Sequence, residues 1–112
     1  MREILKTYEF DTFLKELTPK TIEKFDRIIE IIITIKVIPT KFVKKLVGTE
    51  FYEMRVSIGY NEYRTVLFSI DAENIIEATK IVLVSGFLKK SKKQYKQEIK
   101  KAIKILEYYD YK

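Results

Sequence analysis

The sequence contains no cysteine, no histidine and no tryptophan, and it has only three glycines and two prolines among its 112 residues. Without cysteine the chain has no disulfide and no thiolate site. Without histidine it also lacks the usual acid/base group of neutral pH and the commonest metal ligand. Because glycine and proline are scarce and 46% of the residues are hydrophobic, a disordered chain is excluded. We expect one packed domain over residues 1–112, with no metal and no cofactor.

Long apolar runs are also missing. The longest tract, residues 28–38, carries Glu30, Thr34 and Lys36 and is shorter than the ~20 residues that a membrane span needs. The N-terminal stretch MREILKTYEF lacks the apolar segment and the cleavage site of a signal peptide. These absences predict a cytoplasmic protein that does not act in a membrane.

The net charge of +6 is concentrated in one segment. Residues 89–112 hold nine lysines against Glu98, Glu107 and Asp110, whereas the other 13 of the 22 basic residues balance the other 13 of the 16 acidic ones. Such asymmetry is typical of proteins that bind polyanions, although basic tails also occur without that role. Nucleic acid is therefore a candidate partner.

The N-terminal third predicts one strand and two helices. Residues 3–9 alternate weakly between apolar and polar, as a first strand does. Asp11 is a suitable N-cap for a short helix, and the Thr-Pro pair at 18–19 supplies an N-cap followed by proline at the first helical position. We expect the second helix to run to about Lys36, although its β-branched second half has the propensity of a strand.

The remainder predicts a meander and a helix. After Pro39 and a connector over residues 41–49, three strand-like runs with turn signals between them favour an antiparallel meander over residues 51–58, 62–70 and 75–87. The third run is apolar at both parities, as a strand covered on both faces would be, and we expect it to be the central strand. We expect Ser91 to cap a last helix, whose apolar stripe is Tyr95, Ile99, Ala102, Ile103 and Leu106. The predicted fold class is α+β.

Three spaced phrases suggest a family. They are Tyr52-Glu53-Met54-Arg55, Tyr63-Arg64 and Gly86-Phe87-Leu88-Lys89-Lys90, followed by the basic helix. In this order of elements and phrases, residues 3–106 resemble the RelE/ParE superfamily of bacterial toxin–antitoxin toxins, its HigB-like branch most of all. The resemblance implies a RelE-like fold, a cognate antitoxin as partner and cleavage of mRNA on the ribosome. The alternative is a non-catalytic member of the same fold, such as an inhibitor of DNA gyrase.

The resemblance also implies the site. It gives Arg55, Arg64, Lys89, Lys90 and Tyr95 as catalytic residues, and the charge pattern adds Lys92, Lys93, Lys96 and Lys100 as RNA-binding residues. Metal-free cleavage through the 2′-OH needs a base, cations for the phosphorane and an acid. In this hypothesis a lysine of the crowded 89–93 cluster is the base, the arginines stabilise charge, and Tyr95 stacks a nucleobase or donates a proton.

Structural roles stay open for several of these residues. The arginines can be ordinary strand residues, Tyr95 can be the top of the apolar stripe, and the helix lysines can be a solvated face. A shared site also needs Arg55 and Arg64 on one face of the sheet. A three-residue loop between their strands would separate them, and a four-residue loop would bring them together. We expect them to converge.

Overall fold

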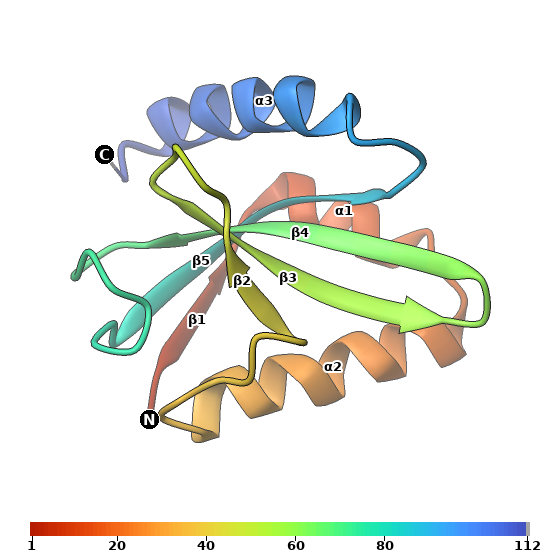
Figure 1. Cartoon of the computed structure of the whole chain (residues 1–112), viewed down its shortest axis with the longest axis horizontal. Helices are drawn as coiled ribbons and strands as arrows, with labels where there is room; N and C mark the ends of the chain where they lie inside the picture. Colours follow the sequence, from red (N-terminus) through yellow and green to blue (C-terminus); the bar gives the residue numbers. More distant parts are fainter. Residues whose placement is uncertain (112) are drawn as a thin grey trace.

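The computed structural model describes residues 1–111 and contains a five-stranded mixed sheet with helices on both faces (Figure 1). Along the chain the elements are β1 (Glu3–Lys6), α1 (Tyr8–Lys15), α2 (Pro19–Thr34), β2 (Val43–Lys45), β3 (Phe51–Ile58), β4 (Asn61–Ser69), β5 (Lys80–Leu88) and α3 (Gln94–Tyr109). The strand order is β1-β5-β4-β3-β2, with β1 parallel to β5 and the other pairs antiparallel. The predicted α+β class and the meander β3-β4-β5 are confirmed.

The sheet separates two hydrophobic cores. The helices α1 and α2 cover one face and α3 covers the other (Figure 1). Strand β5, which lies between β1 and β4, serves both cores, because Ile81 and Leu83 pack toward α1 and α2 while Val82 and Val84 pack toward α3. All four are fully buried. This confirms the prediction of a strand covered on both faces, but the expected central position is wrong, because β4 is the middle strand of the five.

Helix α2 forms where the cap and the helical period predict it. Thr18 is the N-cap, its hydroxyl accepts a hydrogen bond from the backbone N–H of Thr21, and Pro19 opens the helix. The helix ends at Thr34, two residues before the expected end. Packing of its apolar face against the sheet outweighs the strand propensity of its isoleucines. Its buried residues are Thr21, Phe25, Ile28, Ile29 and Ile32.

Helix α1 begins earlier than predicted. The first strand stops at Lys6, and Thr7, not Asp11, is the N-cap, because the Thr7 hydroxyl accepts from the backbone N–H of Phe10. Thr7 is buried, so its cap is protected from water, whereas Asp11 lies exposed in the first turn. The expectation of a strand over residues 3–9 is therefore wrong in its second half.

Three other boundaries also differ. Residues 43–45 of the expected connector form the edge strand β2, and the last strand begins at Lys80, not at residue 75. Ser91 does not cap α3. Instead the helix begins at Gln94, whose side-chain oxygen accepts from the backbone N–H groups of Lys90 and Ser91. That amide closes the turn between β5 and α3, and a serine hydroxyl cannot do the same from position 91.

The register of the β3–β4 hairpin determines which face of the sheet Arg55 and Arg64 occupy. Ile58 pairs with Asn61, so the loop has two residues, neither three nor four. Gly59 has φ of 60° at the first loop position, the pattern of a type II′ turn, which favours glycine there. A two-residue loop has the same parity as a four-residue one, and Arg55 lies directly opposite Arg64. Their convergence on one face is confirmed, although the expected loop length was wrong.

A β-bulge in β5 changes which face its last residues occupy. Ser85 pairs with Val66 and Leu83 pairs with Leu67, so Val84 is an extra residue in β5. The Thr7 hydroxyl donates to the Val84 carbonyl at 2.6 Å. After the bulge Phe87 lies opposite Arg64, on the face that α3 covers. If β5 kept its length but had no bulge, regular alternation along the strand would place Phe87 on the other face.

Candidate functional site

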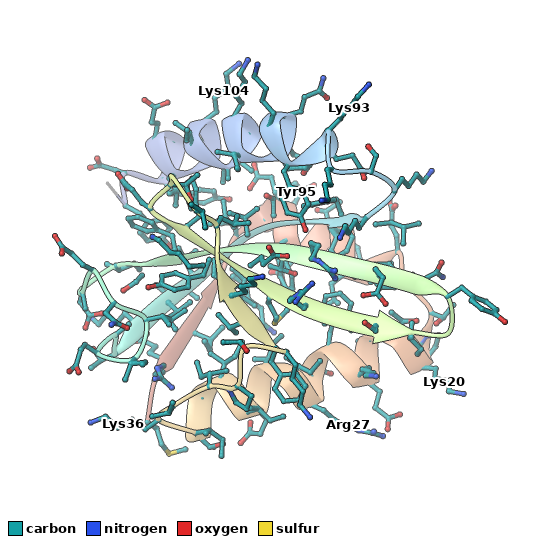
Figure 2. The ribbon with its side chains drawn as sticks, in the orientation of Figure 1. Lys20, Arg27, Lys36, Lys93, Tyr95 and Lys104 are labelled. Carbon is teal, nitrogen blue, oxygen red and sulfur yellow. The ribbon has the colours of Figure 1, made fainter. Side chains whose placement is uncertain are left out.

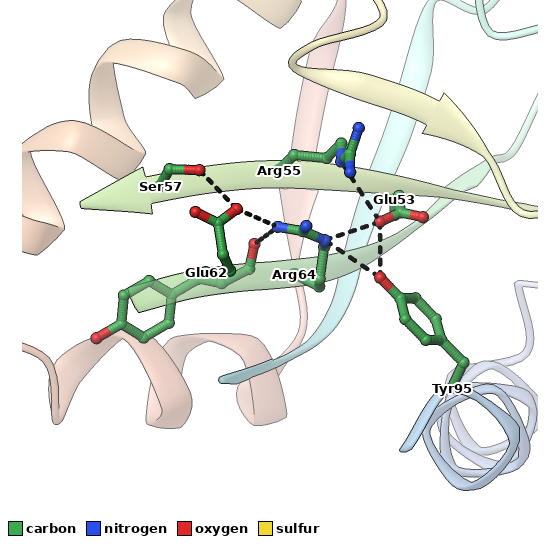
Figure 3. Close-up of polar contacts among 7 residues, drawn as sticks. Glu53, Arg55, Ser57, Glu62, Arg64 and Tyr95 are labelled. Carbon is green, nitrogen blue, oxygen red and sulfur yellow. Dashed lines mark hydrogen bonds and ion pairs between the residues drawn. The ribbon is translucent and has the colours of Figure 1, made fainter. Parts of the chain in front are cut away.

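The residues that the sequence singled out meet on the α3 face of the sheet, below the first turn of α3. Strand β3 contributes Arg55, β4 contributes Arg64, and α3 contributes Tyr95, which points toward the sheet (Figures 2 and 3). The end of β5 adds Lys89, whose backbone N–H donates to the Glu62 carbonyl at 2.7 Å. The hairpin register and the bulge together bring these side chains to one place.

A carboxylate that the sequence analysis did not assign lies at the centre. One oxygen of Glu53 accepts a hydrogen bond from the Tyr95 hydroxyl at 2.9 Å and pairs with Arg64 Nε at 2.9 Å (Figure 3). Arg55 Nε lies 3.8 Å from the same oxygen. The Glu53 side chain is only 10% exposed. Two arginines and a phenol therefore orient a single, nearly buried carboxylate.

Arg64 is fully engaged in this network. Its side chain is 3% exposed, and Nη1 donates to the Tyr63 carbonyl at 2.9 Å and lies 3.4 Å from a Glu62 carboxylate oxygen. The same Glu62 oxygen accepts from the Ser57 hydroxyl at 2.7 Å, which lowers the pKa of Glu62 together with the nearby arginines. Arg64 thus holds Glu53 in place and offers little of its guanidinium to a ligand.

Arg55 differs from Arg64 in exposure. Its side chain is 33% exposed, and its ion pair with Glu53 is the longer of the two at 3.8 Å. A planar guanidinium in this position can contact a phosphate with two parallel hydrogen bonds. Of the two arginines that the sequence predicts, Arg55 is the one that can reach a bound anion.

Tyr95 belongs to the core and to the network at the same time. Its ring packs edge-on against Phe87, with ring centres 5.5 Å apart, and Lys89 Nζ lies 6.0 Å from the ring centre. Burial, and then the hydrogen bond to the Glu53 carboxylate, raise the pKa of Tyr95. The phenol therefore keeps its proton at neutral pH. The two readings of Tyr95, apolar stripe or site, do not exclude each other.

The other predicted lysines lie around the site and do not enter it through any polar contact among residues 1–111. Lys90, Lys92 and Lys93 are exposed in the segment between β5 and α3. On α3, Lys96 and Lys100 are exposed as well. Lys93 and Lys104 point away from the sheet (Figure 2). The structure thus separates one lysine at the tyrosine ring from a basic outer surface.

The geometry supports acid/base chemistry on a phosphate ester. A fixed carboxylate can accept a proton, a protonated phenol can donate one, and Arg55 and Lys89 supply positive charge beside them. Across residues 1–111 there is no cluster of three or more acidic side chains that could hold a metal ion. The sequence alone did not identify Glu53 as a site residue, although strand parity placed it on the same face as Arg55. The reason is that its partner Tyr95 is brought to it only when α3 packs on the sheet.

One surface pocket lies away from the network. It has a volume of about 690 Å³ and is lined by Lys45, the Thr49–Glu50 turn and residues 68–73 at the end of β4. None of the network residues line it. In the described part of the chain, no helix has the length and apolar character needed to cross a bilayer.

Comparison with known proteins gives one informative result. No curated protein and no solved structure matches the chain significantly. The family model described as "Phage derived protein Gp49-like (DUF891)" matches residues 12–107, which include the whole site. This family comprises RelE/ParE-like toxins of toxin–antitoxin systems, which indicates an antitoxin as partner. With a match over most of its length, the chain belongs to the Gp49-like family of RelE/ParE-like toxins.

Proposed function

We propose that this toxin is a ribosome-dependent mRNA endonuclease of the HigB-like type, which cleaves RNA through the 2′-OH without a metal. The observation that carries the proposal is the Glu53 carboxylate, fixed by Arg64 and Tyr95 beside the more exposed Arg55. Action on the ribosome, and with it a cytoplasmic location, rests on the resemblance to the RelE/ParE superfamily. The antitoxin would cover the basic face around this site.

Glu53 is the general base of the proposed reaction. An ionised carboxylate has free lone pairs that can accept the 2′-OH proton, whereas a lysine ammonium group is a donor with no lone pair to accept one. Arg64 and Tyr95 keep one Glu53 oxygen in a defined position. This assignment replaces the hypothesis of a lysine base with a residue whose contacts suit the task.

Arg55, Lys89 and Lys90 stabilise negative charge on the phosphate. Arg55 is the partly exposed guanidinium next to the base, and Lys89 Nζ lies 6.0 Å from the centre of the Tyr95 ring. Charged hydrogen-bond donors stabilise the phosphorane most when the protein already fixes their positions before the substrate binds. Arg64 serves the site indirectly, because it positions Glu53.

Tyr95 is the general acid for the 5′-oxygen that leaves. Its raised pKa keeps the phenol protonated, and the alkoxide that departs is far more basic than a phenolate, so proton transfer to it is favourable. Phe87 fixes the ring from the side. Lys92, Lys93, Lys96 and Lys100 then attract RNA through the field of the basic segment.

The test is cleavage of mRNA on purified ribosomes by the wild-type protein and by Glu53→Gln. We expect fragments that end in a cyclic 2′,3′-phosphate or a 3′-phosphate, with a free 5′-hydroxyl on the other side. Loss of the base should lower the rate by about 10²- to 10⁴-fold. Glu107→Gln, an exposed change near the far end of α3, is the matched control and should cleave normally.

Two results would contradict the proposal. Glu53→Gln could cleave as fast as wild type, which would exclude Glu53 as the base. Alternatively, the wild type could leave mRNA intact and block supercoiling by DNA gyrase, which would favour the non-catalytic inhibitor.

A further inference from the structure

The edge strand β2 places a lysine beside the site. Lys44 pairs with Glu53 in the antiparallel register between β2 and β3. Side chains of directly paired residues lie on the same face, so Lys44 stands on the α3 face, next to the carboxylate. Lys44 is exposed. Sequence analysis treated this segment as a connector and gave it no role.

Helix α3 leaves this part of the sheet open. It packs on β5 and β4, whereas β2 lies at the far edge, beyond β3 (Figure 1). Arg55 is two residues beyond Glu53 on β3, so it is the diagonal neighbour of Lys44, at a typical distance of about 7–8 Å. Two cations on an uncovered surface thus flank the Glu53 carboxylate.

The Lys44 ammonium group does not contribute an ion pair to the folded structure among the described residues. Within residues 1–111 Glu53 forms ion pairs with Arg55 and Arg64, and Lys44 takes part in none. An unpaired lysine that stays near a carboxylate already neutralised by two arginines adds net positive charge at this edge. That charge is positioned for a second anionic group next to the one that Arg55 would bind.

We propose that Lys44 binds an RNA phosphate adjacent to the one held by Arg55, so that the substrate strand crosses β3 and leaves over β2. This inference rests on the proposed function for the identity of the polyanion. It extends the binding surface from the basic segment at residues 89–93, across the network, to the opposite edge of the sheet.

The neighbouring lysine provides a matched control. Lys45 pairs with Tyr52 on the opposite face, where its Nζ lies 4.8 Å from the centre of the Tyr52 ring. Lys44 and Lys45 therefore share a strand, a charge and exposure to solvent, but they face opposite sides of the sheet. Only the first can meet RNA bound at the site.

The experiment measures binding of a short fluorescent RNA by anisotropy over a series of salt concentrations. The RNA carries 2′-O-methyl groups, so it cannot be cleaved. We expect Lys44→Gln to weaken binding by roughly three- to tenfold at low salt and to reduce the salt slope by about one, as for loss of one phosphate contact. Lys44→Arg should retain both values, and Lys45→Gln should behave as wild type.

The outcomes separate this inference from the nuclease proposal. If Lys44→Gln and Lys45→Gln have the same affinity and slope, Lys44 does not contact RNA and the inference is overturned, whatever the cleavage assay shows. If the wild type fails to cleave mRNA on ribosomes but binds the modified RNA with a slope that depends on Lys44, only the nuclease proposal fails. Thermal melts of each variant verify that the fold is retained.

Discussion

At the scale of single residues, the Glu53 network determines which substitutions are informative. Removing one partner of a buried ion pair leaves an uncompensated charge, which is strongly destabilising. Arg64, with a side chain 3% exposed, is such a partner, so Arg64→Ala would test stability more than chemistry. Glu53→Gln removes a charge but keeps the shape and can still hydrogen-bond to Tyr95 and Arg64. It therefore separates chemistry from folding better.

The raised pKa of Tyr95 predicts a loss of stability in alkali. In the unfolded chain a tyrosine releases its proton near pH 10, while burial and the Glu53 carboxylate make the folded protein retain it. Above about pH 10 the unfolded state therefore binds fewer protons, and the free energy of unfolding falls as pH rises. Below that pH the contribution is complete. Melting temperatures between pH 8 and pH 12 should decline less in Tyr95→Phe than in wild type.

Tyr60→Phe is the control for that series. Tyr60 lies fully exposed at the tip of the β3–β4 hairpin, so its variant should decline as steeply as wild type. An identical alkaline decline in Tyr95→Phe and Tyr60→Phe would show that the Tyr95 proton is not linked to folding.

At the scale of elements, Thr7 joins α1 to the bulge of β5. Its hydroxyl accepts from the Phe10 N–H as the N-cap and donates to the Val84 carbonyl. Thr7→Val removes a cap, worth about 1 kcal/mol, and leaves a buried carbonyl without that partner, worth about 1–3 kcal/mol more. Thr18→Val removes only the cap and its bond to Thr21. Urea unfolding should therefore show the larger loss for Thr7→Val.

The same pair should differ in activity. If the bulge relaxes in Thr7→Val, Phe87 and Lys89 shift relative to Tyr95, and RNA cleavage falls at temperatures where the variant is still folded. Thr18→Val should keep its activity there. Equal unfolding free energies for the two variants would mean that the Val84 hydrogen bond contributes nothing.

Elements with local signals could be predicted from the sequence. Thr18 and Pro19 marked the start of α2, and the apolar run around Ile81–Val84 marked β5 as a strand covered on both faces, although not its place in the strand order. Gly59 marked the hairpin, although not its length. Strand parity then placed Arg55 and Arg64 together. In each of these cases the residues that indicate the feature in the sequence are the same residues that form it in the structure.

Features set by distant partners could not be predicted. Strand β2 has three residues and exists because β3 pairs with it. The carbonyl of the bulge residue Val84 accepts its hydrogen bond from Thr7, 77 residues away. Glu53 became a candidate base only when Tyr95, 42 residues later, was seen above it. Pairings over such separations leave no periodic pattern in the sequence.

At the scale of the whole molecule, the two faces of the sheet have different roles, one in the core and one at the site. One face forms a core with α1 and α2, whereas on the other face α3 packs mainly on β5 and β4 (Figure 1). On that second face Lys44 of β2 is exposed and Arg55 of β3 is partly exposed. The lysines of residues 89–104 lie on α3 and on the segment before it. A polyanion would therefore meet positive charge on the helix first and the open edge of the sheet next.

This arrangement predicts that salt dependence grows with RNA length. Neutralising more phosphates releases more counterions, and the slope of log affinity against log salt rises in proportion. A short RNA should reach the site alone, while a longer one should also contact the exposed lysines of α3. The double variant Lys96→Gln/Lys100→Gln should then lower the slope for the longer RNA only. If its slope equals that of wild type at both lengths, the helix lysines are a solvated face.

The bulge in β5 makes the number of residues in this strand decide which face of the sheet its last side chains occupy. Deleting one residue between positions 83 and 86 would close the bulge and leave Phe87 opposite Arg64, whereas inserting one residue there would turn Phe87 and Lys89 toward the Phe13 and Phe25 side and insert a cation into a core. A deletion in the turn before Lys80 changes no parity. Among relatives, changes of length should therefore be tolerated before β5, and within β5 a deletion at the bulge should be tolerated but an insertion should disrupt the site. One inserted residue, and not any change of chemistry, would be enough to turn such a toxin into a harmless protein.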